Sequence, residues 1–396
     1  MSADIVKIRM GGSIIENTGD MNTSQTEGQP RLVALDAFRG AIIALMVVVN
    51  DPGQGSDAYA PLQHSRWNGW TITDVVFPSF LWIIGVAITL SLAKRIEAGA
   101  SRAQLFRQVL RRGAILFGLG LLVYLFPTFD FSTMRVLGVL QRLAICYVVA
   151  SAIYLTTGIR GQIAWIAALL AAYWLLMMLA PVPGCGAAGQ LDVDCNFAHY
   201  VDRVVLGQHN YQNTKTWDPE GIVSTLPSIA TALLGIMAGH ILRLKRELAE
   251  RTTWMFFAGS LLLAGGLVCD LWLPINKQLW TSSFALFMAG LDFIMLAMSI
   301  WWIDGMGRQS TVRPLVVMGM NPIAVYMASE LLDITLGFFH VQSGGVSLSL
   351  HAWLYQTVFV PMASPANASL LYSLAYVGLM FLLAYWMYRR QWFVRV

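Results

Sequence analysis

The stretch LDAFRGAIIALMVVVNDPGQGSDAYAPLQHSRWNGWT, residues 35–71, is the most informative part of this chain for its fold. Its first half predicts an apolar helix with Asp36 and Arg39 near the start and Asn50 at the end. A loop then presents His64 ahead of a tryptophan-rich segment and a second apolar helix. Charged and amide groups beside a membrane span are costly unless they have partners or a task. This pattern therefore indicates a helical membrane protein with a functional polar cluster.

The composition of the whole chain agrees with this interpretation. Of its 396 residues, 57% are hydrophobic and 12% are charged, whereas a soluble domain has about 25% charged residues. Since one crossing takes ~20 apolar residues, we predict an all-α polytopic membrane protein with about ten transmembrane helices. The ten predicted spans are 33–50, 71–93, 113–126, 135–156, 161–180, 221–241, 253–273, 280–303, 314–337 and 366–388.

The basic residues give the expected orientation of these spans. Most of the 26 lysines and arginines fall on one side, including a cluster in a predicted inner loop at 94–112. Cytoplasmic loops are enriched in Lys and Arg, so both termini are expected to be cytoplasmic. The same distribution is typical of membrane topology rather than of nucleic-acid binding.

The domain organisation is simple. Residues 1–30 are polar, have no apolar signal-peptide region, and are expected to form a flexible cytoplasmic tail. Residues 31–396 are expected to form a single transmembrane domain, with a long outer loop at 181–220 and a surface segment at 338–365. Two cysteines, Cys185 and Cys195, share the outer loop, where an oxidising compartment would permit a disulfide.

His64 is the strongest candidate for chemistry. An imidazole can move a proton or an acyl group near neutral pH, although a loop histidine can also be plain surface. Asp74, in the first turn of the next helix, is placed to accept a hydrogen bond from an imidazole or a sugar hydroxyl, or simply to cap that helix. Asn50 can orient the imidazole, stabilise an oxyanion or end its helix. Trp67 and the neighbouring Asn68 suit a sugar platform and a turn.

Other polar residues lie in or beside the apolar spans. Arg142 follows Gln141 inside the fourth predicted span, and a buried guanidinium needs a carboxylate, a phosphate or a cavity. Asp292 is a candidate partner for it. Asn321, before a proline, is expected to break the ninth span. The remaining candidates are the Asp36–Arg39 pair, the outer-face pair Asn276 and Lys277, and the inner arginines, which can bind anionic groups or simply follow the positive-inside rule.

Several segments together resemble the heparan-α-glucosaminide N-acetyltransferase family, a branch of the transmembrane acyltransferases. The block with His64 and the block with Asn276 and Lys277 are the most specific of them. The matching segments are Leu35-Asp-Ala-Phe-Arg-Gly, Met46-Val-Val-Val-Asn50, His64-Ser-Arg-Trp-Asn-Gly-Trp-Thr-Ile-Thr-Asp74, Val76-Phe-Pro-Ser-Phe, Gly138-Val-Leu-Gln-Arg-Leu, Asp218-Pro-Glu-Gly221, Leu234-Gly-Ile-Met-Ala-Gly239, Pro274-Ile-Asn-Lys-Gln-Leu-Trp280 and Gly319-Met-Asn-Pro-Ile.

The resemblance implies transmembrane acetylation. Cytosolic acetyl-CoA would give its acetyl group, by way of a histidine near the outer face, to an amino sugar or sugar hydroxyl outside. The histidine of the family falls on His64, its asparagine on Asn50 and an arginine on Arg112. With this division, we assign Trp67, Asn68, Asp74, Asn276 and Lys277 to the acceptor, and Arg39, Arg112, Gln141, Arg142 and Asn321 to CoA.

Further expectations follow from the resemblance. The chain looks like the compact bacterial (NagX-type) members, without the luminal domain and extra first span of the lysosomal ones, and is therefore expected in a bacterial inner membrane. The expected partners are acetyl-CoA, the amino-sugar acceptor and membrane lipids, with a homodimer as a family-level expectation. No metal is expected, since His199 and His209 are better explained as loop residues.

A transporter of glucosamine or N-acetylglucosamine is the alternative function. His64, Asn276 and the tryptophans would then form a sugar site. Transporters often contain paired broken helices in two repeats, whereas this sequence indicates one broken span and no repeat.

Overall fold

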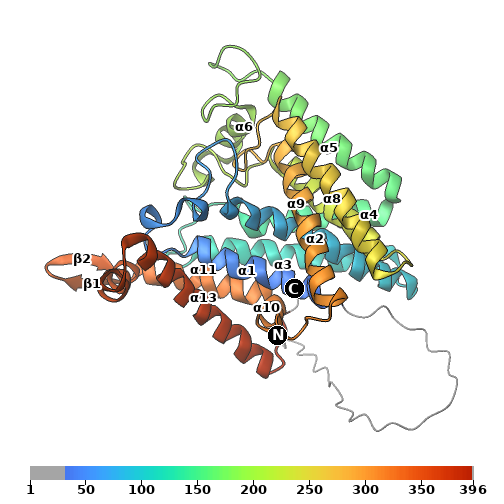
Figure 1. Cartoon of the computed structure of the whole chain (residues 1–396). Coiled ribbons are helices and arrows are strands. Elements are labelled where there is room, and N and C mark those ends of the chain that lie inside the picture. The colour runs from blue at the N-terminus through green and yellow to red at the C-terminus, as the bar shows by residue number, and fades with distance from the viewer. Residues whose placement is uncertain (1–31, 395–396) are drawn as a thin grey trace, which may run out of the picture.

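A computed structural model describes residues 32–394 as a helical bundle (Figure 1). The expected N-terminal tail at 1–30 lies outside the described residues. Within them, nine helices are long and apolar enough to cross a membrane, or ten if one bent pair forms a single span. The prediction of an all-α protein with about ten transmembrane helices is therefore confirmed. The orientation of the termini stays a prediction.

The helices alternate with short loops along the chain. The membrane-length helices are α1 (Val33–Asn50), α2 (Ile72–Glu97), α3 (Arg102–Leu125), α4 (Val139–Thr156), α5 (Ile159–Leu179), α7 (Thr225–Leu242), α8 (Leu248–Asp270), α9 (Ser282–Ser299, continued by a π-turn to Gly305) and α13 (Pro365–Arg389). The shorter elements are α6 (Phe197–Leu206), α10 (Arg313–Gly319), α11 (Pro322–Phe338), α12 (Leu350–Leu354), and strands β1 (His340–Ser343) and β2 (Val346–Ser349).

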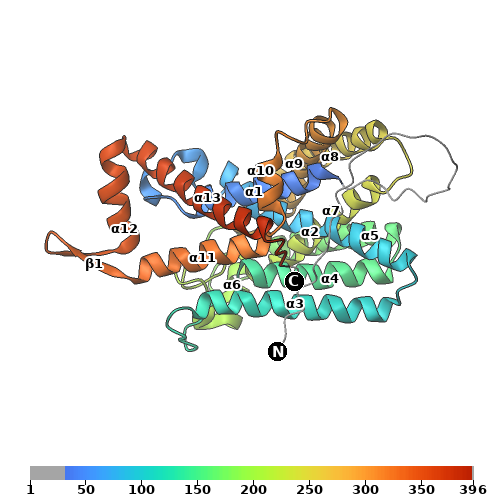
Figure 2. The same ribbon diagram turned by 90° about the horizontal axis from the view of Figure 1, so that it is seen from below.

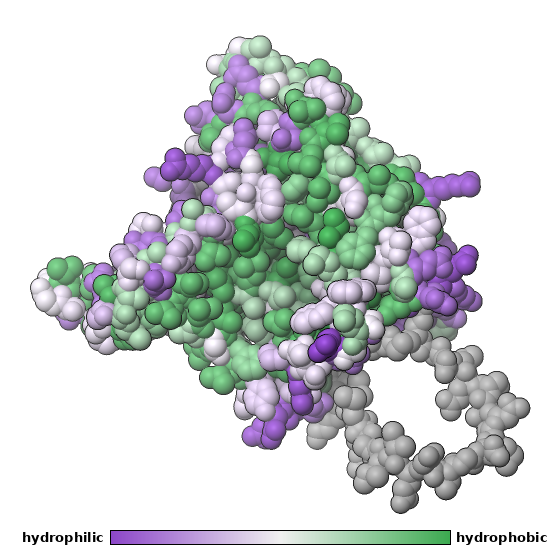
Figure 3. Space-filling view, in the orientation of Figure 1, coloured by the Kyte–Doolittle hydropathy of each residue, from purple (hydrophilic) through white to green (hydrophobic). Residues whose placement is uncertain are grey.

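The surface of the bundle has the distribution that a membrane requires. Hydrophobic side chains cover most of the face in Figure 3, and hydrophilic residues gather toward its margins. Large apolar side chains on α5 and α8, such as Trp165, Leu179, Phe257 and Leu261, are each at least 46% exposed. Exposed apolar side chains are unfavourable in water and favourable in contact with lipid, so this surface is suited to a membrane.

The ninth predicted span is broken, as the sequence indicates. Helices α10 and α11 are bent by 79° relative to each other, and Pro322 begins α11. Asn321 lies at the break, where its amide contacts the C-terminal segment. Its Nδ2 donates to the carbonyl oxygen of Trp392 at 3.0 Å, and the backbone N–H of Val394 donates to its Oδ1 at 2.9 Å.

Four predicted helix starts differ from the structure by four residues or more. The sixth span begins at Thr225 rather than 221, and the seventh at Leu248 rather than 253. The third span, predicted at 113–126, is the 24-residue helix α3, so arginines expected in an inner loop lie on a helix. Hydropathy misses this start because arginine is charged, although it is a good helix former. Ser101 caps the helix by accepting a hydrogen bond from Gln104 N at 3.2 Å. The fourth span begins at Val139 rather than 135, so Gln141 and Arg142 lie in its first turn.

The surface segment at 338–365 contains a small hairpin. Strands β1 and β2 pair antiparallel around Gly344 and Gly345, both with positive φ, and α12 follows. Figure 2 shows that the hairpin projects from the bundle, and that α3 and α4 lie side by side along one edge. The expected position of this segment along the membrane surface stays a prediction.

Glycines allow α2 and α7 to pack closely. A Cβ atom at Gly85 would lie 1.9 Å from the carbonyl oxygen of Ala232, and one at Gly235 would lie 2.0 Å from that of Trp82. Small residues at such crossings let helix backbones approach one another within a membrane. Because α2 lines the cavity described below, this crossing also fixes one wall of the candidate site.

We expect the change Gly85→Ala to destabilise the protein by at least about 1–3 kcal/mol, because the added methyl group meets backbone that cannot rotate away. Gly118→Ala on α3 is the matched control, since no other described residue lies within 4 Å of a Cβ atom there. Alanine in an open helical position normally stabilises relative to glycine. Thermal unfolding in detergent measures both, and equal midpoints would contradict the close crossing.

Candidate active site

A cavity of about 590 Å³ runs through the bundle along α2. The α2 residues that line it recur every three or four positions, so they form one face of the helix. From Thr73 to Leu92 this face is about 28 Å long at 1.5 Å per residue, close to the ~30 Å hydrocarbon core of a bilayer. The lining residues on α2 are Thr73, Val76, Phe77, Phe80, Ile83, Ile84, Ala87, Ile88, Ser91 and Leu92.

The two ends of this cavity differ in chemistry. Arg39 of α1 and Arg112 of α3 line it toward the Leu92 end of α2, which we call the arginine end. Asn50 and His64 line it toward the Thr73 end, together with Lys277; we call this the histidine end. A mostly apolar passage therefore connects two cationic side chains with an imidazole.

His64 is held by a carboxylate at the histidine end. Its Nδ1 lies 2.7 Å from Asp74 Oδ1, and the imidazole is 51% exposed whereas the Asp74 side chain is fully buried. Because a carboxylate accepts a hydrogen bond, the proton belongs on Nδ1, which leaves the Nε2 lone pair available. The hydrogen bond expected between an imidazole and Asp74 is therefore present, in the arrangement of an Asp–His pair in acyl-transfer sites.

Asp74 also caps α2. Its Oδ2 accepts hydrogen bonds from the backbone N–H groups of Thr71 at 3.0 Å and Ser65 at 3.1 Å. One carboxylate therefore joins the loop, the start of the helix and the imidazole. Two of the roles that the sequence left open for Asp74, the contact with an imidazole and the helix cap, are therefore present together.

Lys277 completes this cluster from a distant part of the chain. Its Nζ lies 3.2 Å from Nδ1 and 3.3 Å from Nε2 of His64, and 3.9 Å from Asp74 Oδ1. Lys277 follows Asn276 in the loop between α8 and α9. Asn276 Nδ2 donates to Asn68 Oδ1 at 3.2 Å, and Gly69 N donates to the Ile275 carbonyl oxygen at 2.7 Å, so the two loops are joined directly.

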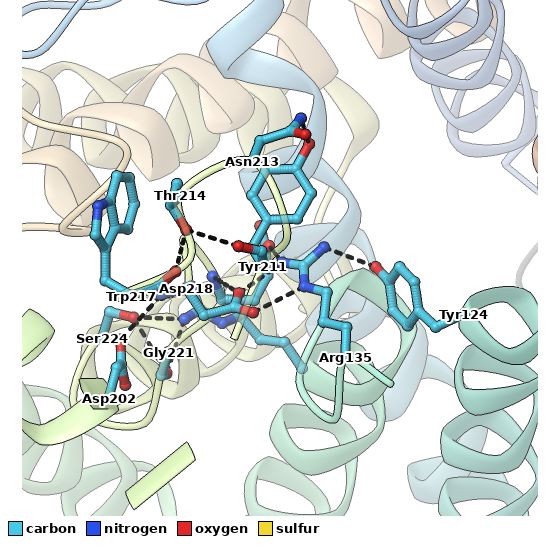
Figure 4. Close-up of polar contacts among 12 residues, drawn as sticks. Tyr124, Arg135, Asp202, Tyr211, Asn213, Thr214, Trp217, Asp218, Gly221 and Ser224 are labelled. Carbon is cyan, nitrogen blue, oxygen red and sulfur yellow. Dashed lines mark hydrogen bonds and ion pairs between the residues drawn. The ribbon is translucent and has the colours of Figure 1, made fainter. Parts of the chain in front are cut away.

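The outer loop supplies a charged wall that the sequence analysis missed. Arg135 Nε donates to Asp218 Oδ2 at 2.8 Å, another nitrogen of its guanidinium donates to Glu220, and Nη1 donates to the Tyr124 hydroxyl at 2.9 Å (Figure 4). The guanidinium also stacks 4.4 Å from the ring centre of Tyr211. The signal was the segment Asp218-Pro-Glu-Gly221, quoted only for its resemblance to a family and not assigned to a site.

The charges in this wall stabilise one another. Burial disfavours the charged form of Arg135, but Asp218 and Glu220 outweigh it and raise the pKa of the guanidinium. Burial likewise favours a neutral Glu220, yet the positive charges of Arg135, Arg142 and Lys277 hold the pKa of that carboxyl below its ordinary value. The histidine end is therefore a network of ionised groups rather than a neutral pocket.

Three of the residues assigned to CoA do not line the cavity within the described part of the chain. Arg142 is 1% exposed, donates to the Gly221 carbonyl oxygen at 2.9 Å and lies over the ring of Trp280. Its predicted pairing with Asp292 is wrong, because Asp292 instead accepts a hydrogen bond from Ser79. Gln141 is buried beside Gly120. Asn321 contacts the C-terminal segment, whereas the following residues Pro322, Ile323 and Tyr326 do line the cavity.

The two other assigned polar residues of α1 have direct partners. Arg39 Nη1 lies 3.4 Å from Asp36 Oδ1, so the predicted pair is present, and it donates to the Gly319 carbonyl oxygen at 3.3 Å. The amide of Asn50 lies close to the Glu330 carboxyl group. Both Arg39 and Asn50 face the cavity.

Trp67 anchors the outer loop rather than the cavity wall. Its Nε1 donates to the Leu191 carbonyl oxygen at 3.2 Å, and its ring packs edge-on against His199 and Trp217. Trp217 lines the cavity and stacks on His199 with ring centres 4.0 Å apart. The assignments of Trp67, Asn68 and Asn276 to the acceptor stay predictions, since these residues support the wall from behind.

A disulfide closes the outer loop. Cys185 and Cys195 are bonded, with Cα atoms 5.5 Å apart, so the bond that the sequence permits is present. Helix α6 begins two residues later and carries His199, which is 1% exposed and donates a hydrogen bond from Nδ1 to the Val193 carbonyl oxygen at 2.7 Å.

The sequence of this chain matches known proteins. Residues 31–266 match the family model described as heparan-alpha-glucosaminide N-acetyltransferase, catalytic. The human heparan-alpha-glucosaminide N-acetyltransferase is 32% identical to this chain over an alignment that covers 77% of the chain and 53% of the human protein. The mouse protein of the same name is also 32% identical, over 76% and 54%. The chain therefore spans about half the length of the curated relatives it matches.

The buried His199 predicts acid sensitivity of the outer loop. Burial lowers the pKa of this imidazole from 6.5 to about 4, so the stability it contributes is present above pH 6.5 and lost as the pH falls toward 4. The loss amounts to roughly 3 kcal/mol. We expect His199→Phe, which keeps a ring against Trp217, to flatten the decline of the unfolding midpoint between pH 6.5 and 4.

His209→Phe is the control, because His209 lies on the same loop but is only half-buried. It should keep the acid sensitivity of the wild type in thermal unfolding. Parallel declines of all three proteins with falling pH would refute the assignment to His199.

Proposed function

This chain belongs to the heparan-α-glucosaminide N-acetyltransferase family, and on that premise we propose that it is a membrane-embedded acetyltransferase. It moves the acetyl group of cytosolic acetyl-CoA to an amino sugar or a sugar hydroxyl on the opposite side of the membrane. The single observation that carries the proposal is the cavity along α2, which connects the arginine end with His64 over nearly the thickness of a bilayer.

The arginine end suits the donor. CoA carries phosphate groups, and guanidinium groups bind phosphate oxygens with two parallel hydrogen bonds. Arg39 and Arg112 line the cavity there, and the apolar passage beyond them matches the uncharged chain of CoA that ends in the thioester. We infer that this end faces the cytosol, in line with the excess of basic residues on that side.

The histidine end suits the transfer. Asp74 fixes the imidazole with its proton on Nδ1, so the Nε2 lone pair of His64 serves as general base toward the acceptor or as nucleophile toward the thioester. Both routes use the same atom. The cavity wall there, with Tyr211, Thr214 and Trp217, offers the hydroxyl and aromatic groups that commonly bind a sugar.

The location and assembly are part of the proposal. We infer a bacterial inner membrane with both termini in the cytosol, and a homodimer as an expectation taken from the family. No metal is needed for either route at His64, because the imidazole supplies the base or the nucleophile.

The test is acetyl transfer by the purified protein in detergent, with radiolabelled acetyl-CoA as donor and glucosamine as acceptor. Labelled N-acetylglucosamine is the expected product. If the protein neither binds CoA nor transfers acetyl to any amino sugar, while proteoliposomes that contain it take up sugar, the protein is a transporter instead.

We expect His64→Ala to lower the transfer rate by ~10²–10⁴-fold, the usual contribution of general acid–base catalysis. Binding of CoA at the other end should be unchanged. The neighbouring exposed residue gives the control Gln63→Ala, which should transfer at the wild-type rate. Transfer assays and CoA titration calorimetry on the same preparations check this, and undiminished transfer by His64→Ala would refute the role of the imidazole.

A second prediction concerns the donor. Arg112→Ala should raise the KM for acetyl-CoA about ten- to hundredfold, since a hydrogen bond to a charged group contributes about 1.5–3 kcal/mol. Arg111→Ala is matched in charge and helix position, but Arg111 is exposed on α3 and is not among the described cavity-lining residues. A similar rise in KM for both variants would mean that overall charge, not the cavity, binds CoA.

A further inference from the structure

We propose that Lys277 is a catalytic residue whose ammonium group stabilises the oxyanion formed when the acetyl carbonyl is attacked beside His64. This inference rests on the proposed acetyl transfer and adds a role to it. The sequence alone suggests that Lys277 binds the acceptor, whereas its contacts with His64 and Asp74 point to the reacting carbonyl.

The ammonium group of Lys277 lies close to the imidazole of His64. Nζ is about equally far from the two ring nitrogens, at 3.2 and 3.3 Å. In the ring plane, an atom at these distances from both nitrogens would lie either beyond Cε1 or beyond Cγ and Cδ2. In either position it would be too close to a ring carbon. Nζ must therefore lie to one face of the ring, and the Nε2 lone pair, which lies in the plane, stays open to the cavity.

Negative charge develops on the acetyl carbonyl oxygen during transfer, and this oxygen lies near Lys277. A carbonyl carbon that bonds at Nε2, or that is attacked by an acceptor deprotonated by Nε2, lies in line with that lone pair. Its oxygen then projects sideways, within hydrogen-bond reach of a group that is 3.3 Å from Nε2. A cation held there before the reaction stabilises the oxyanion without reorganising in the transition state.

Hydrogen bonds within the turn at 276–281 hold Lys277 in place. Trp280 N donates to the Lys277 carbonyl oxygen at 3.0 Å, and Leu279 N donates to Asn276 Oδ1 at 2.9 Å. Asn276 N in turn donates to Thr281 Oγ1 at 3.1 Å. The Lys277 side chain is only 15% exposed, so the ammonium is preorganised rather than mobile.

The chemistry balances with Lys277 in this role. The lone pair of the acceptor nitrogen or oxygen forms a bond to the acetyl carbon, and the π electrons of the carbonyl move onto its oxygen, next to Lys277. The acceptor gives its proton to Nε2 of His64. The oxyanion electrons then return, the carbon–sulfur bond breaks, and the CoA sulfur leaves and takes that proton. Lys277 keeps its own protons throughout, so it acts through charge alone.

The charged neighbours of Lys277 decide its protonation. Burial lowers its pKa below the usual 10.5, and Arg142 acts in the same direction, while Asp74 and Glu220 favour the ammonium. His64 is the remaining titratable group in contact with it. The rate should therefore fall on the alkaline side as Lys277 loses its proton, at a lower pH than an ordinary lysine would give.

The decisive experiment measures kcat, KM and the pH profile of acetyl transfer for Lys277→Met and Lys277→Arg. Lys277→Met should lower kcat by ~10²–10³-fold, the usual cost of one oxyanion donor, with the KM for both substrates changed little. Lys277→Arg should restore part of kcat, and its alkaline decline should disappear because arginine stays charged. Lys215→Met, at an exposed lysine of the outer loop, is the control and should behave as wild type.

The outcomes separate the two proposals. If wild-type protein transfers no acetyl group, the proposed function fails. If the wild type is active and Lys277→Met raises only the KM for the acceptor, Lys277 binds the acceptor and the oxyanion role is wrong. An unchanged kcat overturns it as well. CoA affinity and thermal unfolding show whether each variant is folded. If Lys277→Met is misfolded, the kcat and the alkaline decline of Lys277→Arg test the oxyanion role instead.

Discussion

A charge inside a bilayer must meet a counter-charge, a hydrogen-bonding group or water, and this constraint organises the interior of the protein. Some polar groups are sealed by protein, as Arg142 is by the Gly221 carbonyl and the ring of Trp280. Others face the cavity, as His64 and Arg112 do. The sealed groups hold helices and loops in register, whereas the groups that face the cavity are available to a ligand. Contact with the cavity therefore separates the polar groups that can meet a ligand from those that only support the fold.

Asp74 connects these two classes. Its carboxylate accepts hydrogen bonds from the backbone N–H of Thr71 at the start of α2, from that of Ser65 in the preceding loop, and from the imidazole of His64. One face of α2 forms a wall of the cavity from end to end. The same carboxylate therefore positions both this wall and the imidazole. Fold and site cannot shift independently at this point. The hydrogen bonds of the Lys277 turn hold its ammonium group against one face of the same ring.

The sequence predicted the features that depend on local patterns. Hydropathy found the spans because each helix must be apolar on its own, but it missed the arginine-rich start of α3. The contact between His64 and Asp74 was foreseeable, because the two are ten residues apart across one capped loop. Lys277 meets His64 across 213 residues, and Arg135 meets Asp218 across 83. Such pairings arise from helix packing, which no local pattern in one sequence specifies.

The amide of Asn321 has a mechanical consequence. It holds the backbone of Trp392 and Val394 at the break between α10 and α11, and Pro322 directly after it borders the cavity. A pull on the carboxyl end of the chain is thus transmitted through two hydrogen bonds to the passage itself. Affinity tags and fusion partners are therefore better attached at the amino end, far along the chain from this anchor.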